Sequence, residues 1–207
     1  MKKWIILLVV SLLGCGQDAI KNTPIAQGAT VLVLGDSLSF GTGASEGEDY
    51  PTLLANNTGW QIINAGIPGD TSAGGLQRLP DLLTEYQPKL LIVELGGNDL
   101  LRQVPKSQTI SNLKAILAQA KAQNIPSVLV AIPEISALRA AIGQLSDHPL
   151  YEEIAKETGT ALISNVFSEV LSDNDLKSDQ IHANAKGYAE ISKKMSEQLK
   201  HFGFTNK

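Results

Sequence analysis

One buried strand that ends in a glycine-rich turn constrains the fold of this chain more than any other stretch. Residues 31–43 read V-L-V-L-G-D-S-L-S-F-G-T-G, so an apolar run stops abruptly at Gly35. An apolar run with β-branched residues and no polar alternation is typical of a strand that is buried on both faces of a parallel sheet. We therefore expect Ser37 to follow the carboxyl end of a central strand, at the edge where open α/β sheets bind their ligands.

Short apolar runs alternate with helical stretches along the rest of the chain. The expected strands are Thr30–Leu34, Gln61–Asn64, Leu90–Leu95, Ser127–Ile132 and Ala161–Ile163. The expected helices are Tyr50–Asn57, Leu76–Tyr86, Ser107–Gln123, Leu150–Thr158 and Ala185–His201. Every connection between strands is long enough for a right-handed crossover, and 207 residues suit one core rather than two. The sequence therefore predicts one α/β domain over residues 30–207, with a mainly parallel five-stranded sheet between helices.

The first fifteen residues carry the pattern of an export signal. Two lysines precede an apolar run that is too short to span a bilayer as a helix, and a small residue precedes Cys15. The sequence L-L-G-C at 12–15 resembles the lipobox of bacterial lipoproteins, in which the cysteine is lipidated and begins the mature protein. We expect a signal peptide over 1–14 and a lipid anchor at Cys15. An ordinary signal peptide that contains a cysteine is the alternative.

Residues 15–29 are expected to form the lipidated end and a flexible tether. The stretch 16–28 is polar, carries Pro24 and has no hydrophobic period. Cys15 is the only cysteine, so no disulfide is expected although the chain is exported. Lipidation would hold the domain at a membrane of the bacterial cell envelope. In a Gram-negative source, the residue that follows Cys15 favours the periplasmic face of the outer membrane.

Glycine-rich loops follow the first three expected strands, and in a parallel sheet these loops meet at one edge. Ser37 in the first loop is either a nucleophile or a turn serine that caps a helix. Gly66 and Gly69 in the second loop could each turn a backbone N–H toward a ligand. Asn98 in the third loop could donate its amide to a developing negative charge, or could be an ordinary turn residue.

Only one of the three histidines has a carboxylate at a useful spacing. Asp179 precedes His182 by three positions, so the two side chains can lie on one side of a turn, where the carboxylate orients the imidazole. His148 has its nearest acid directly adjacent in sequence, which is a poor spacing for a hydrogen-bonded pair. His201 is explained as a surface residue near the end of the last helix. With a serine in the first loop, the Asp179 and His182 pair indicates nucleophilic catalysis.

Four blocks in the expected order identify a resemblance to the SGNH, or GDSL, hydrolases. They are G-D-S-L at 35–38, N-A-G at 64–66, G-G-N-D at 96–99 and D-x-x-H at 179–182. The segment 63–76, I-N-A-G-I-P-G-D-T-S-A-G-G-L, is similar to the corresponding sequence in the bacterial group of thioesterase I, lysophospholipase L1 and arylesterases. The resemblance implies a three-layer α/β/α, flavodoxin-like domain with five parallel strands. It also implies cofactor-free hydrolysis of esters or thioesters through an acyl-enzyme.

The resemblance further implies a role for each matched residue. Ser37 would be the nucleophile, His182 the general base and then acid, and Asp179 the residue that orients His182. Ser37, Gly66 and Asn98 would form the oxyanion hole. One departure is visible, because D-Q-I-H-A-N stands where the group more often shows D-G-I-H-P-N. The loop that holds His182 therefore lacks a glycine and a proline.

The substrate is less constrained by the sequence. The apolar segment 132–145 lies where this group carries a mobile loop that closes on the acyl chain. Leu138, Ile142 and Leu145 are candidate acyl-groove residues, although an amphipathic packing helix explains their spacing equally well. Aromatic residues make up 5% of the chain and leave few surfaces on which sugars stack. This disfavours, but leaves open, an acetyl esterase that acts on cell-envelope polysaccharide.

A non-catalytic, flavodoxin-like module that binds a ligand is the alternative from another class. G-T-G-A-S-E-G at 41–47 nearly matches a phosphate-binding loop, but the acidic residues around it would repel phosphate. The chain has no Walker motif and no Cys/His cluster, so neither nucleotide nor metal is expected. The net charge of −4 without a Lys/Arg cluster disfavours a nucleic-acid partner. We therefore expect a serine ester hydrolase with a small-molecule ester or thioester substrate and a membrane contact through Cys15.

Overall fold

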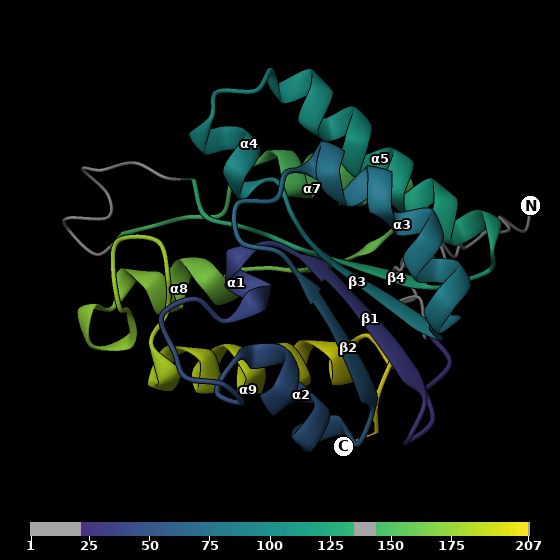
Figure 1. Cartoon of the computed structure of the whole chain (residues 1–207), viewed down its shortest axis with the longest axis horizontal. Helices are drawn as coiled ribbons and strands as arrows, with labels where there is room; N and C mark the ends of the chain where they lie inside the picture. Colours follow the sequence, from purple (N-terminus) through teal and green to yellow (C-terminus); the bar gives the residue numbers. More distant parts are fainter. Residues whose placement is uncertain (1–21, 135–143, 207) are drawn as a thin grey trace, which may run out of the picture.

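The computed structural model describes residues 22–134 and 144–206, which form a five-stranded sheet between two layers of helices (Figure 1). The strands are β1 (Thr30–Gly35), β2 (Gln61–Gly66), β3 (Leu90–Glu94), β4 (Ser127–Val130) and β5 (Ala161–Ile163). They lie in the order β2-β1-β3-β4-β5, and every neighbouring pair is parallel. The predicted three-layer α/β fold with a parallel sheet is confirmed.

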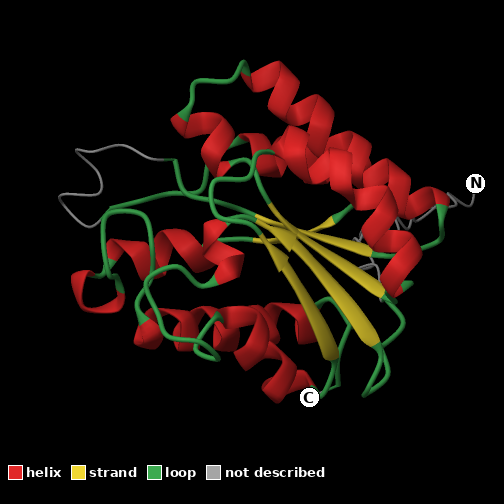
Figure 2. Ribbon diagram, viewed as in Figure 1, coloured by secondary structure: helices red, strands yellow, loops and turns green. Residues whose placement is uncertain are grey.

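The helices cover both faces of the sheet. Their bounds are α1 (Ser37–Phe40), α2 (Tyr50–Thr58), α3 (Ser72–Tyr86), α4 (Gly97–Leu101), α5 (Lys106–Ala122), α7 (Leu150–Thr158), α8 (Val166–Ser172) and α9 (Ala185–His201), with a 3-10 turn η1 (Asn174–Leu176). Helices α2, α8 and α9 pack on one face and α3, α5 and α7 on the other, so that the strands in Figure 2 are enclosed from both sides. The short helices α1 and α4 follow β1 and β3 directly, at the carboxyl edge of the sheet.

The two central strands carry the core. Residues 31–34 of β1 have no exposed surface, and all five residues of β3 are buried. Because helices cover both faces, neither strand needs polar alternation. The register places Gly35 beside Gly66 of β2 on one side and beside Glu94 of β3 on the other. These three residues therefore lie side by side under the loop that carries Ser37.

The chain is hydrogen-bonded to the domain from Asn22 onward, whereas a flexible tether was expected over residues 15–29, of which 15–21 lie outside the described residues. The N–H of Asn22 donates to the carbonyl of Phe202 at 3.3 Å, and the N–H of Ile25 donates to the carbonyl of Phe204 at 2.8 Å. Ile25 also packs against the hydrophobic core. The stretch has no hydrophobic period because it packs as an irregular segment rather than as a helix or strand.

The expected signal peptide at 1–14 and the expected lipidation site Cys15 lie outside the described residues. Within the part of the chain that the structure describes, no helix has both the length and the apolar character needed to cross a membrane.

Candidate active site

Ser37, His182 and Asp179 form a connected line of side chains at the carboxyl edge of the sheet. Ser37 is the first residue of α1, and His182 lies in the loop before α9. The Nε2 atom of His182 lies 3.0 Å from Oγ of Ser37, and its Nδ1 atom lies 2.7 Å from Oδ2 of Asp179. With the ring proton on Nδ1, Nε2 is free to accept the proton of Ser37. The structure thus brings together the serine, histidine and aspartate that the sequence singled out.

The loop before α9 also holds the other oxygen of Asp179. Oδ1 accepts the backbone N–H groups of Ile181 and His182, both at 2.8 Å. Partial burial acts to raise the pKa of Asp179. The hydrogen bonds from the His182 ring and from the two N–H groups outweigh it and keep that pKa below its ordinary value. The carboxylate therefore stays charged, and it can orient the imidazole and stabilise its protonated form.

Asp36 connects the turn of Ser37 with Asn98. Its Oδ1 atom accepts the N–H of Leu38 at 3.0 Å and caps α1, while its Oδ2 atom accepts an amide hydrogen of Asn98 at 2.9 Å. Burial raises the pKa of Asp36 to about 6, although both hydrogen bonds act to lower it. The Asn98 amide carries two hydrogens, so one is left for another acceptor. Asp36 thereby fixes the direction of the Asn98 side chain.

Gly66 does not supply the free N–H that the sequence led us to expect, because this N–H donates to Oδ1 of Asn64 at 3.0 Å. A Cβ atom at Gly66 would lie 2.4 Å from the backbone nitrogen of Phe40 and 2.9 Å from the carbonyl oxygen of Asp36. Real Cβ atoms do not come so close to backbone atoms. Glycine is therefore required at position 66 because the backbone of α1 packs directly on β2.

Gly69, the second glycine of this loop, has a different environment. Its φ is +79°, and the N–H of Asp70 donates to the carbonyl of Ile67 at 3.0 Å, as in a type II turn with Pro68 and Gly69 at its centre. The Gly69 carbonyl accepts from Nη2 of Arg102 at 2.8 Å. The N–H of Gly69 donates to no other described residue. The Pro-Gly pair is the signal in the sequence that marks this turn.

Arg78 is a further residue near the site that the sequence did not single out. From α3, its Nε atom contacts Oδ2 of Asp70 at 2.8 Å, and its Nη2 atom donates to the carbonyl of Gly35 at 3.0 Å. It therefore ties the end of β1 to the loop that follows β2. No motif or spacing marks this role, because the three residues are brought together only by the fold.

A small cleft of about 40 Å³ opens beside Ser37 and His182. Its apolar lining consists of Leu38, Leu101, Ile132, Pro133, Leu145, Leu171 and Ile181. Leu145, an expected acyl-groove residue, is thus placed at the cleft, where its N–H donates to Oγ of Ser172 at 2.9 Å. The other two, Leu138 and Ile142, lie outside the described residues.

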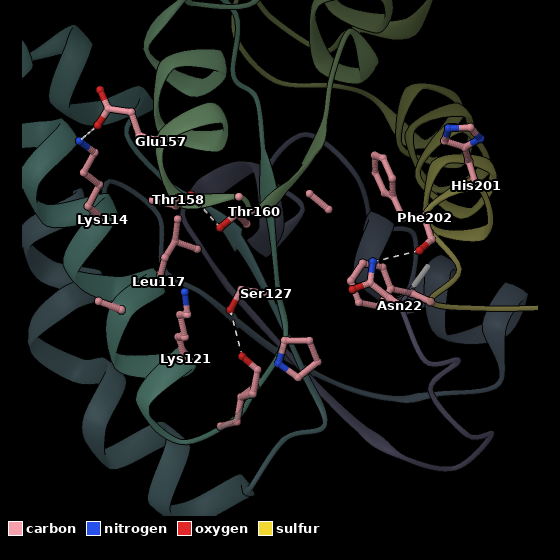
Figure 3. Close-up of a pocket in the computed structure, with 16 residues that line it drawn as sticks. Asn22, Lys114, Leu117, Lys121, Ser127, Glu157, Thr158, Thr160, His201 and Phe202 are labelled. Atoms are coloured by element: carbon pink, nitrogen blue, oxygen red, sulfur yellow. Dashed lines mark hydrogen bonds and ion pairs between the residues drawn. The ribbon is translucent and has the colours of Figure 1, made fainter. Parts of the chain in front are cut away.

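A larger cavity of about 630 Å³ lies at the opposite edge of the sheet, between α5, α7 and the end of α9 (Figure 3). Lys121, His201 and Phe202 are among the residues that line it. The lining includes none of the Ser37 line, by which we mean Ser37, His182 and Asp179. His148 is also separate from that line, since its Nδ1 atom accepts the N–H of Leu150 at the start of α7. Across the described ranges, no three His, Cys, Asp or Glu side chains gather as metal ligands would.

Fold and site together define an α/β protein with the side-chain arrangement of a serine hydrolase. Residues 33–190 match the model of the GDSL-like lipase/acylhydrolase family, and the chain belongs to that family. It is therefore a hydrolytic enzyme.

Relatives with named activities resemble most of the chain. A protein of Escherichia coli K12 named thioesterase 1/protease 1/lysophospholipase L1 is 39% identical over 178 residues, which are 82% of this chain and 83% of that protein. The arylesterase of Vibrio mimicus is 30% identical over 179 residues, 82% of this chain and 87% of its own. The crystal structure of TesA matches with a TM-score of 0.74 at 31% identity and covers 84% of this chain and 99% of its own.

Proposed function

We propose that the protein is a serine esterase that hydrolyses carboxylic esters, and thioesters as well, through an acyl-enzyme on Ser37. The observation that carries the proposal is the unbroken line from Oγ of Ser37 through the ring of His182 to Asp179. A serine hydroxyl in contact with a histidine whose second nitrogen faces a carboxylate is an activated nucleophile.

The reaction would proceed in two half-reactions. Oγ of Ser37 attacks the carbonyl carbon of the ester while Nε2 of His182 takes the hydroxyl proton. His182 then gives this proton to the leaving alcohol or thiol, and the acyl group remains on Ser37. Water enters, His182 takes one of its protons, and the hydroxide oxygen attacks the acyl carbon. The acid leaves, and the proton returns from His182 to Ser37.

Three donors would stabilise the negative oxygen that forms in each half-reaction. The N–H of Ser37 and the second amide hydrogen of Asn98 are two of them. The third is the N–H of Gly69 rather than that of Gly66, because Asn64 already occupies the latter. Such donors act most strongly when they are fixed before the reaction. Asp36 supplies this fixation for Asn98.

The substrate would carry an apolar group. The largest exposed apolar side chains among the described residues are Phe40 (56%), Ile67 (48%) and Leu101 (46%). All three lie in the loops and short helices that follow β1, β2 and β3, at the edge that holds Ser37. Of the three, Leu101 also lines the apolar cleft beside Ser37, and exposed apolar side chains at such an edge suit an aryl or acyl group. The aryl esters, lysophospholipids and acyl thioesters suggested by the relatives' names all contain one.

We also propose that the protein is held at a membrane by a lipid on Cys15. Asn22 is tied to Phe202 and lines the cavity at the edge opposite Ser37 (Figure 3). Seven residue steps separate Cys15 from Asn22, and such a chain spans at most about 25 Å. A lipid at Cys15 would therefore hold this opposite edge near the membrane and turn the cleft away from it.

Kinetics with p-nitrophenyl esters of increasing acyl length, and with acyl-CoA, test the proposed function. We expect turnover of both classes, none in Ser37→Ala, and in Leu145→Ala a KM that rises at least about threefold for octanoyl and not for acetyl esters. Equal turnover by folded Ser37→Ala would contradict the mechanism. If KM in Leu145→Ala depended on acyl length as it does in the parent, the cleft would not be the site that binds the acyl group.

A further inference from the structure

Glu94 is the last residue of β3, and its side chain is fully buried beneath the loop that carries Ser37. The proposed reaction does not use it. Its Oε2 atom accepts the hydroxyl of Ser39 at 2.6 Å, the N–H of Ser39 at 3.0 Å and the N–H of Asp36 at 3.4 Å. Groups from both sides of Ser37 in the sequence thus converge on one carboxyl oxygen.

We propose that Glu94 is a positioning residue for the nucleophile: it holds the backbone on both sides of Ser37, so that the hydroxyl and the N–H of Ser37 face the substrate. The helix α1 has only four residues, and so short a helix does not hold its own shape or direction. An external acceptor that binds both Asp36 and Ser39 supplies this constraint. The inference rests on the esterase function proposed above.

The strand next to Glu94 is adapted to this contact. Gly35 of β1 lies beside Glu94 in the register. A Cβ atom at Gly35 would lie 2.0 Å from Oγ of Ser39 and 2.9 Å from Oε2 of Glu94, so a side chain there would separate the two. The Ser39 hydroxyl also lies 2.7 Å from the hydroxyl of Tyr50. The network thereby connects β3, the nucleophile turn and α2.

Core stability does not explain a glutamate at this position. The Oε1 atom is buried and has no hydrogen-bond partner among the described residues. A buried polar atom without a partner lowers stability. The bonds to Asp36 and Ser39 are what a glutamate adds here.

An uncharged carboxyl suits this position better than a charged one. Burial raises the pKa of Glu94 well above its ordinary value, and the negative charge of Asp36 adds to that effect. In the uncharged acid, Oε2 remains the accepting oxygen and the proton sits on Oε1. Ser39 and Asp36 then keep their bonds, and no second negative charge lies near the substrate oxygen that becomes negative. Glutamine has the same shape and keeps the acceptor.

The test compares Glu94→Gln with Glu94→Met in the full chain, using kcat, KM and the rate at which a fluorophosphonate labels Ser37. We expect Glu94→Met to lower kcat and the labelling rate about 100-fold, as loss of an oxyanion donor does, with KM within about threefold. Glu94→Gln should restore both rates to within about fivefold of the parent. The control Thr58→Val removes a buried hydroxyl that bonds the carbonyl of Leu54, remote from the turn, and should leave both rates unchanged.

Each other outcome has a defined meaning. Unchanged rates in folded Glu94→Met would overturn the proposal, and so would Glu94→Gln rates as low as those of Glu94→Met. If Glu94→Met does not fold, Glu94→Asp takes its place, because the shorter side chain draws the acceptor away from Asp36 and Ser39. A labelling rate in folded Glu94→Asp within about threefold of the parent would then overturn the proposal. A parent that is labelled at Ser37 but hydrolyses no ester would contradict the esterase function and leave the role of Glu94 measurable.

Discussion

The Nε2 atom of His182 lies 3.0 Å from Oγ of Ser37, although the two residues are 145 positions apart in the chain. Ser37 is fixed by the end of β1 and the cap of α1, whereas His182 is fixed by the loop before α9. Two independent parts of the fold thus converge on one hydrogen bond.

Replacing Asp179 by Asn should lower kcat about 10³- to 10⁴-fold, because the amide no longer favours the His182 tautomer with its proton on Nδ1. KM should change much less. The measurement is steady-state kinetics on a p-nitrophenyl ester, with circular dichroism to verify folding. Retention of more than about a tenth of the parental kcat would mean that Asp179 does not orient His182.

Replacing Gly66 by Ala should lower both activity and stability. The new Cβ would lie 2.4 Å from the backbone nitrogen of Phe40, so α1 must shift, and overpacking of this kind costs about 1–3 kcal/mol. The matched control is Gly47→Ala, which has a φ of +84° but no atom within 4 Å of the added Cβ. Gly47→Ala should retain full kcat. Equal effects of the two variants on kcat would contradict the close contact between α1 and β2.

The raised pKa of Asp36 should make the free energy of unfolding depend on pH. Its pKa is raised by burial to about 6 in the folded protein, so the folded state binds this proton more tightly than the unfolded chain does. The free energy of unfolding should therefore fall as the pH rises from about 4 to about 6, by about 3 kcal/mol for a two-unit shift. Urea unfolding at several pH values measures this slope.

The variant Asp36→Asn should reduce that slope, since it removes the titrating group. The exposed Asp81→Asn is its control and should keep the parental slope. A slope in Asp36→Asn equal to the parental one would show that Asp36 does not titrate in this range.

Replacing Cys15 by Ser should move the protein from the membrane to the soluble fraction, because the residue that carries the lipid is lost. Ser37→Ala should stay in the membrane fraction. Unchanged fractionation of Cys15→Ser would contradict lipidation as the anchor. The orientation has its own readout, since a dye at Lys121→Cys should be quenched by a quencher attached to lipid more strongly than a dye at Glu46→Cys. The reverse order would contradict the orientation.

The sheet was predictable from the sequence because burial on both faces leaves uninterrupted apolar runs in β1 and β3. The start of α3 was not, since its first turn contains Gly74 and Gly75, which indicate a loop. Gly75 is tolerated inside the helix because the side chain of Leu95 fills the space where its Cβ would be. The short helices α1, α4 and α8 were also missed, because four to seven residues carry no helical period.

The residues of the Ser37 line were predictable because each follows a recognisable local pattern. The residues that position these side chains were not predictable from the sequence. Whether Gly66 or Gly69 supplies an oxyanion-hole N–H depends on the Asn64 side chain. Its Oδ1 atom accepts the N–H of Gly66 and does not bond that of Gly69. The sequence around Glu94 indicates only the end of a buried strand. Nothing near it in sequence shows that Asp36 and Ser39 donate hydrogen bonds to its carboxyl group. Such contacts arise from the pairing of β1 with β3, which the sequence does not display.

Whether His182 activates Ser37 is measured by the intact mass of the purified protein after treatment with a serine-directed fluorophosphonate. We expect a single adduct that maps to Ser37, no adduct in Ser37→Ala, and labelling at least about 100-fold slower in His182→Ala, which lacks the base. No adduct in a folded sample, an adduct on another residue, or equal labelling of His182→Ala would show that Ser37 is not a nucleophile activated by His182. The interpretation as a non-catalytic ligand-binding module would then take precedence.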